Sequence, residues 1–162
     1  MAALASVEPV QIAGTYLSTL LHEVKTTGLL SVLGNYGPTM VRWIDGGMPL
    51  FTTLHTGSVL PLQTSSTVIL FLTYCSREQT RAVLDSERSA GLSVPEDETC
   101  GFARTYGSVV PGLSAVTVPI FGVDERLVAT MSVLARTQDK NFYSHRKIEK
   151  IRLRALEASR AI

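Results

Sequence analysis

The sequence predicts one α+β domain of 162 residues, in which helices pack on an antiparallel sheet of about five to six strands. Three observations predict this fold. Hydrophobic residues make up 45% of the chain and charged residues only 18%, which is typical of a folded chain with a large core. Apolar residues recur at helical spacing near both ends. Between them, short apolar runs are separated by tight turns, so consecutive strands should run antiparallel.

The first helix is predicted over residues 9–25. Pro9 suits a first turn, where its missing N–H would have had no partner. One apolar face follows at helical spacing, made of Ala13, Leu17, Leu20, Leu21 and Val24. The helix should end before the Thr26-Thr27-Gly28 sequence.

Three strands are predicted next, over residues 29–33, 40–44 and 50–55, with glycine-containing turns between them. Strict alternation would place Val41 and Trp43 on one face of the second strand and its other residues on the opposite face. Trp43 is expected in the core. Arg42 is expected in a salt bridge or an interface.

The stretch from 57 to 72 is the centre of the sequence, an extended segment that turns into a helix over 65–74. Thr64, Ser65 and Ser66 are good N-cap residues before a long apolar run. The first N–H groups of a helix lack internal partners and carry partial positive charge, so they can bind an anion. Two interpretations stay open here: the hydroxyls only cap the helix, or they also hold a carboxylate.

A second helix should begin near Ser76, and a polar crossing should follow over 88–98. Strands are then predicted over 101–104, 113–121 and 126–135, the last two joined by a hairpin turn at 122–125. Pro119 should make the far end of its strand an edge or a bulge. A final helix over 141–162 carries the apolar stripe Ile148, Ile151, Ala155 and Ile162. This order of elements is that of ligand-sensing domains of the GAF/PAS kind.

Composition argues against several functions. The net charge is +1 and no basic block is long, so the chain lacks the footprint of a DNA-binding surface. The longest apolar runs are too short to span a bilayer. With only two cysteines, Cys75 and Cys100, a reduced, cytoplasmic setting is expected.

No catalytic, phosphate-binding or metal-binding motif is visible, so no enzyme activity, metal or cofactor is predicted. His22, His55 and His145 are scattered along the chain without metal-ligand spacing. The acidic cluster at 96–98 is interpreted as a solvated loop.

Three segments together resemble the effector-binding domain of IclR-type (isocitrate lyase regulator) bacterial transcription regulators. Residues 57–65, GSVLPLQTS, are similar to that family's glycine and Pro-Leu-His-Ala-Ser/Thr before the central helix. Residues 101–104 and 112–121, GFAR and GLSAVTVPIF, are similar to its Gly-Tyr-Ala run and the following strand. Residues 127–133, LVATMSV, are similar to its returning strand.

The resemblance implies a sensor domain over 1–162 that binds a small organic acid or aromatic metabolite and assembles as a homodimer or homotetramer. The helix over 9–25 would be the linker from a winged helix-turn-helix domain that binds the DNA; this chain carries no such module. Carried over by position, the effector-binding residues are Leu50, Ser65, Ser66, Thr67, Thr105, Ala115, Ser132 and Leu134. In characterised members of the family, some of the positions that match Thr105, Ala115 and Leu134 carry an acid, a thiol or a second serine, whereas this chain has Thr, Ala and Leu. A larger apolar or aromatic effector is therefore expected than a two- or three-carbon keto acid.

Two other functions stay open. One is a small GAF-type enzyme with Cys75 or Cys100 as nucleophile. The other is a ligand-free domain that acts only in assembly.

Overall fold

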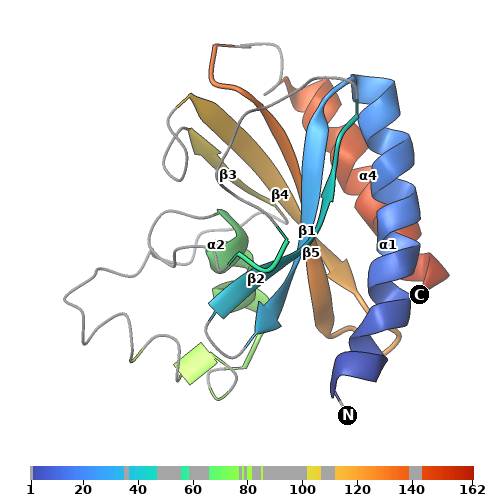
Figure 1. The fold of residues 1–162 in the computed structure, drawn as a ribbon, viewed down its shortest axis with the longest axis vertical. Coiled ribbons are helices and arrows are strands. Elements are labelled where there is room, and N and C mark those ends of the chain that lie inside the picture. Colours follow the sequence, from blue (N-terminus) through green and yellow to red (C-terminus); the bar gives the residue numbers. More distant parts are fainter. Residues whose placement is uncertain are drawn as a thin grey trace.

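The computed structural model describes residues 2–34, 37–46, 56–58, 66–76, 78, 80–81, 85, 102–106, 112–138 and 144–162. Figure 1 shows one antiparallel sheet with helices on both faces. Helices α1 (Ala2–Val24) and α4 (His145–Ala161) cover one face, and α2 (Ser66–Tyr74) lies on the other. This is the predicted α+β architecture.

The sheet has five strands in the order β2-β1-β5-β4-β3, and every neighbouring pair is antiparallel. The strands are β1 (Thr27–Gly34), β2 (Gly37–Ile44), β3 (Ala103–Tyr106), β4 (Leu113–Phe121) and β5 (Leu127–Arg136). The β1–β2 and β4–β5 pairs confirm two predicted hairpins. The strand predicted over 50–55 lies outside the described residues. Ser58 does border β2, because Met40 donates its N–H to the Ser58 carbonyl at 2.8 Å.

The main core lies between the sheet and the helix pair α1–α4. Helix α1 contributes Leu17, Leu20 and Leu21, and each is fully buried. The predicted stripe on α4 is confirmed, since Ile148, Ile151, Ala155 and Ile162 all pack in or against this core. At the surface, Glu23 of α1 pairs with Lys150 and Arg154 of α4 and joins the two helices.

The predicted start of the first helix was wrong. Helix α1 begins at Ala2, not at Pro9, and Pro9 lies inside it. Residues 2–5 are alanine and leucine, which are among the strongest helix formers. Proline removes one backbone hydrogen bond, and the long apolar face of α1 against the sheet offsets this cost. The predicted end before Thr26 is confirmed, because α1 stops at Val24.

A β-bulge changes the facing of residues on β2. Leu30 pairs with Arg42 and Ser31 with Met40, so Val41 is an extra residue without a partner. Val41 consequently packs on the α1 side, and Met40 joins Trp43 on the opposite side. Strict alternation had placed Val41 with Trp43, and that prediction was wrong because it assumed a regular strand.

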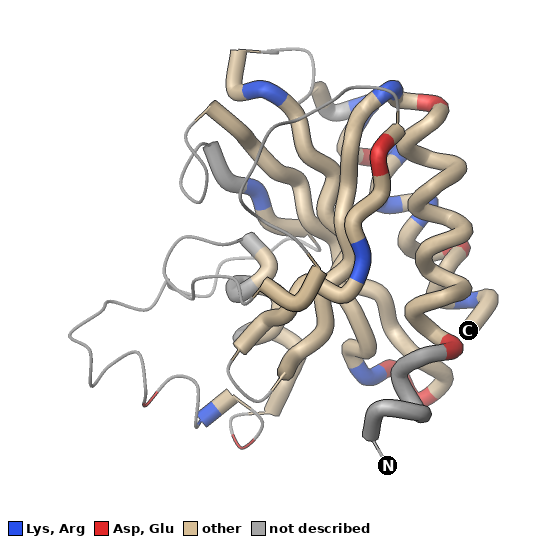
Figure 2. Tube along the Cα trace, in the orientation of Figure 1, with Lys and Arg blue, Asp and Glu red and all other residues tan. Residues whose placement is uncertain are grey.

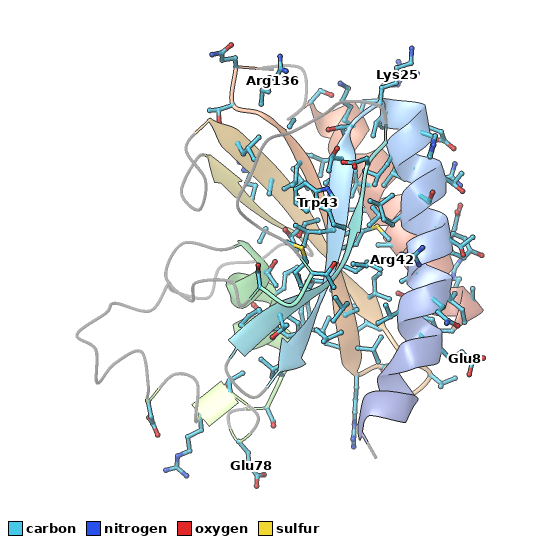
Figure 3. The ribbon with its side chains drawn as sticks, viewed as in Figure 1. Glu8, Lys25, Arg42, Trp43, Glu78 and Arg136 are labelled. Carbon is cyan, nitrogen blue, oxygen red and sulfur yellow. The ribbon has the colours of Figure 1, made fainter. Side chains whose placement is uncertain are left out.

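Arg42 points towards α1, and Trp43 points to the other side of the strand (Figure 3). The Arg42 guanidinium lies over Gly14 of α1, where a side chain would collide with it. Arg42 forms no ion pair with any residue in the described part of the chain, so the expected salt bridge is not found there.

Candidate functional site

The α2-facing side of the sheet carries a row of hydroxyl groups. On β5, Met131 and Val133 point into the main core, so Thr130, Ser132 and Leu134 point to the opposite face. Thr117 of β4 and Ser31 of β1 reach this face by their register with β5. The four hydroxyls of the row, those of Ser31, Thr117, Thr130 and Ser132, are all buried. We call these four residues the hydroxyl row.

The two halves of the hydroxyl row differ in hydrogen bonding. Thr117 and Ser132 are register partners, and their side-chain oxygens lie 2.8 Å apart. Ser31 and Thr130 are also register partners and are 0% exposed, but neither hydroxyl has a hydrogen-bond partner among the described residues. A buried hydroxyl without a partner costs about 1–3 kcal/mol. Such a pair calls for an explanation, and contact with a bound polar group is one that a binding site would supply.

Next to the hydroxyl row lies a small apolar cluster. It contains Leu29, Met40, Leu134, Trp43 and Ala115, which are separate from the main core. Trp43 is half-buried, and its Nε1 donates to Asp45 Oδ1 at 3.1 Å. This surface therefore offers neutral hydroxyls beside an apolar and aromatic wall.

Helix α2 packs against β3, β4 and β5 and covers this face. Ser66 is its first residue and Thr67, which is buried, lies in its first turn. Leu70 and Phe71 are also buried. The start of the helix agrees with the predicted 65–74 to within one residue.

Among the described residues, neither helix α2 nor the hydroxyl row beneath it carries a charged side chain. Figure 2 shows no charged residue on α2. Arg42 and Arg104 are paired with Leu30 and Val116, whose side chains point into the main core, so both arginines belong to the α1 side of the sheet. The hydroxyl row thus favours neutral hydrogen-bonding groups, and an anion would depend on the first turn of α2.

The predicted site residues divide into three groups. Ala115, Ser132 and Leu134 share the α2-facing side of the sheet. Thr105 of β3 is the register partner of Ala115, and Ser66 and Thr67 are in α2. Leu50 and Ser65 lie outside the described residues.

Three residues of the hydroxyl row, Ser31, Thr117 and Thr130, were not among the predicted site residues. A usable signal was present on β5, where polar Thr130 and Ser132 alternate with apolar residues. No such signal identifies Ser31, because its β1 neighbours are buried on both faces.

The described residues offer little for the thiol-enzyme alternative. Cys75 is half-buried, and burial raises the pKa of its thiol, which lowers the fraction of reactive thiolate. Cys100 lies outside the described residues. The described His, Cys, Asp and Glu residues form no group that could hold a metal ion. In the same part of the chain, no helix has the length and apolar character needed to cross a membrane.

Comparison with known proteins adds a fold relationship. No family model matches the sequence, and no curated protein matches it. Solved structures do match, and several of them are transcriptional regulators. HmgR of Pseudomonas aeruginosa has a TM-score of 0.73 at 22% identity, covering 98% of this chain and 68% of that one.

Two further structures show which part of such regulators this chain resembles. IclR of Thermotoga maritima has a TM-score of 0.72 at 15% identity, covering 99% of this chain and 71% of that one. The C-terminal domain of a transcriptional regulator from Vibrio cholerae has a TM-score of 0.73 at 19% identity, covering 94% of this chain and 95% of that one. The chain therefore has an α+β fold of the GAF/PAS kind. More narrowly, its fold is that of the C-terminal domain of IclR-type transcriptional regulators.

Proposed function

We propose that this chain is the effector-binding domain of a bacterial IclR-type transcriptional regulator. It binds a small organic acid or aromatic metabolite on the α2-facing side of the sheet and acts in the cytoplasm. A separate winged helix-turn-helix domain contacts DNA, and the sensor domains assemble as a homodimer or homotetramer. The chain is not an enzyme in this proposal.

The observation that carries the proposal is the Ser31–Thr130 pair, two buried hydroxyls without a partner among the described residues. Unsatisfied buried groups reduce stability, so their presence next to an apolar cluster favours a function that needs them. A bound ligand would accept or donate hydrogen bonds there. Its apolar body would contact Trp43 and Leu134.

The size of the effector is proposed from the apolar side chains on this face. By the resemblance to IclR-type regulators, Ala115 and Leu134 stand at pocket positions that carry a polar side chain in some members, and Trp43 adds an aromatic wall. These residues favour a ring or a branched apolar body over a two- or three-carbon keto acid. A carboxylate on the same ligand would suit the N–H groups at the start of α2.

The proposed mechanism is a population shift. The effector binds one arrangement of the subunits better than another and so changes the positions of the attached DNA-binding domains. Helix α1 is suited to transmit this change, because it packs on the sheet face opposite the hydroxyl row and precedes β1 directly.

The test uses Trp43, the only tryptophan of the chain, as a reporter in the proposed site. Benzoate, phenylacetate, pyruvate and glyoxylate are titrated while tryptophan emission and Tm are followed. An aromatic acid should change the emission and raise Tm by mass action. Leu134→Trp, which fills the site, should abolish the rise in Tm, whereas Val123→Trp at an exposed hairpin position should not.

Binding of pyruvate or glyoxylate without any aromatic acid would contradict the proposed effector class. If no member of a wider metabolite library raises Tm, the domain is one that acts only in assembly, and the proposed sensing function is wrong.

A further inference from the structure

Helix α4 carries an exposed stripe on the side away from the core. Glu149, Leu153, Leu156 and Arg160 are spaced i, i+4, i+7 and i+11, so they lie along one side of the helix. The buried residues Ile148, Ile151, Ala155 and Ala158 occupy the opposite side. Leu153 is 57% exposed and Leu156 is 46% exposed, so the two leucines form a continuous apolar patch on this face of the helix. We call these four residues the α4 stripe.

A groove continues the apolar surface beside the α4 stripe. Among the described residues, strand β3 pairs only with residues 114–117 of β4. The groove lies beyond this pairing, between residues 118–121 of β4 and helix α4. It has a volume of about 290 Å³, and Leu153 and Leu156 form part of its wall. Across it, Tyr74 of α2 and Phe121 of β4 pack edge to face with ring centroids 5.0 Å apart. Leucine side chains from a second helix could enter this groove beside the stripe.

The charges at the two ends of the α4 stripe are opposite. If two copies of α4 pack antiparallel around a twofold axis midway along the stripe, Leu153 of one copy faces Leu156 of the other. Glu149 of each copy then faces Arg160 of the other. Parallel packing would place like charges together at both ends, so the pattern selects the antiparallel arrangement. Arg160 has no ion pair with any described residue, whereas Glu149 already bonds Arg152 at 2.7 Å.

We propose that the α4 stripe is a homodimer interface, in which two copies of the chain pack α4 against α4 in antiparallel fashion. The interface deepens the proposed function by naming the surface through which the sensor domains assemble, and it does not require an effector. The occupant is a second copy because the stripe is complementary to itself in both charge and apolar spacing. An isologous contact of this kind closes as a dimer and does not cover the hydroxyl row, which is on the other face of the sheet.

The test is a charge swap measured by sedimentation equilibrium on the 162-residue chain. The wild-type chain should reach twice its monomer mass of 17.6 kDa as concentration rises. Arg160→Glu gives a stripe that is acidic at both ends, and Glu149→Arg gives one that is basic at both ends. Each variant alone should dimerise at least about tenfold more weakly, because like charges then meet at both ends. An equimolar mixture of the two variants should form a heterodimer with affinity near that of the wild type.

Two controls separate the interface from general charge effects and misfolding. Arg136→Glu and Glu78→Arg reverse exposed charges away from the stripe (Figure 3) and should leave dimerisation unchanged. Leu153→Ser with Leu156→Ser should be monomeric with an unchanged circular dichroism spectrum. A monomeric wild-type chain, single variants that dimerise normally, or a mixture that stays monomeric would each overturn the proposal. Effector-induced changes in Tm are measured on the same samples, so loss of sensing and loss of dimerisation are distinguished.

Discussion

Ser31 and Thr130 lie opposite each other across the β1–β5 ladder, fully buried, and neither hydroxyl forms a hydrogen bond with a described residue. On the other side of β5, Thr117 and Ser132 are also a threonine–serine register pair, and their hydroxyls do bond each other. This contrast between neighbouring pairs allows the cost of the unsatisfied pair to be measured.

Thr130→Val should stabilise the free domain. Valine has nearly the shape of threonine and removes a buried hydroxyl that has no partner to lose. We expect a gain of about 1 kcal/mol in the free energy of unfolding, measured by urea denaturation. The same variant should weaken binding of an effector that uses this hydroxyl.

Thr117→Val is the matched control for that measurement. Thr117 is equally buried, but its hydroxyl bonds Ser132, so valine leaves the Ser132 hydroxyl without this partner. The domain should lose about 1–2 kcal/mol. If the two valine substitutions change the free energy of unfolding equally, the two pairs do not differ in hydrogen bonding in solution.

Two buried glycines should respond differently to alanine. At Gly14 the new Cβ meets the end of the Arg42 side chain, which can move, and alanine favours a helix by about 1 kcal/mol. Gly14→Ala should therefore be neutral or stabilising by up to that amount. At Gly46 the Cβ would overlap the carbonyl oxygens of Thr26 and Leu21, so Gly46→Ala should destabilise by more than about 2 kcal/mol. Thermal unfolding of both variants checks this, and a stable Gly46→Ala variant would contradict it.

The contact between α1 and α4 at Glu23 should depend on pH. The hydrogen bond from Lys150, with the charge of Arg154, lowers the pKa of the Glu23 carboxyl. A carboxyl whose pKa is lower in the folded state stabilises the fold above its ordinary pKa and loses that effect as pH falls through the lower value. Glu23→Gln should lower Tm by no more than about 2 °C at pH 7, because the pair is at the surface. The difference between variant and wild type should vanish in acid; a constant difference at all pH values would exclude the ion pair as its cause.

Cys75 should react slowly with iodoacetamide. Burial raises the pKa of its thiol above the ordinary value, so less thiolate is present at pH 7.5 than in the unfolded chain. We expect alkylation of Cys75, followed by peptide mass spectrometry, to be at least about tenfold slower in the folded protein than in urea. Rapid alkylation of the folded protein at neutral pH would revive the thiol-enzyme alternative.

Local patterns in the sequence predicted most of the described architecture. Helical spacing of Leu17, Leu20 and Leu21 identified the buried face of α1, and the Gly122–Glu125 turn identified the β4–β5 hairpin. These signals depend on neighbouring residues and so are visible in the chain itself.

Features that depend on pairing between distant segments could not be predicted in the same way. The bulge at Val41 arises from the register of β2 against β1, and it exchanged the faces of Val41 and Met40. The Ser31–Thr130 pair joins positions 99 residues apart, so no local pattern brings them together. Pro9 was assigned to a helix start on local grounds, but the helix continues through it.

The alternation along β5 has a consequence for insertions and deletions. Adding or removing one residue before Thr130 would shift the strand by one place and turn Thr130 and Ser132 towards α1, while Met131 and Val133 would face α2. Polar side chains would then enter the main core, and apolar side chains would replace the hydroxyls on the α2-facing side. An insertion or deletion in this central strand should consequently destabilise the domain more than a substitution of any one of its side chains.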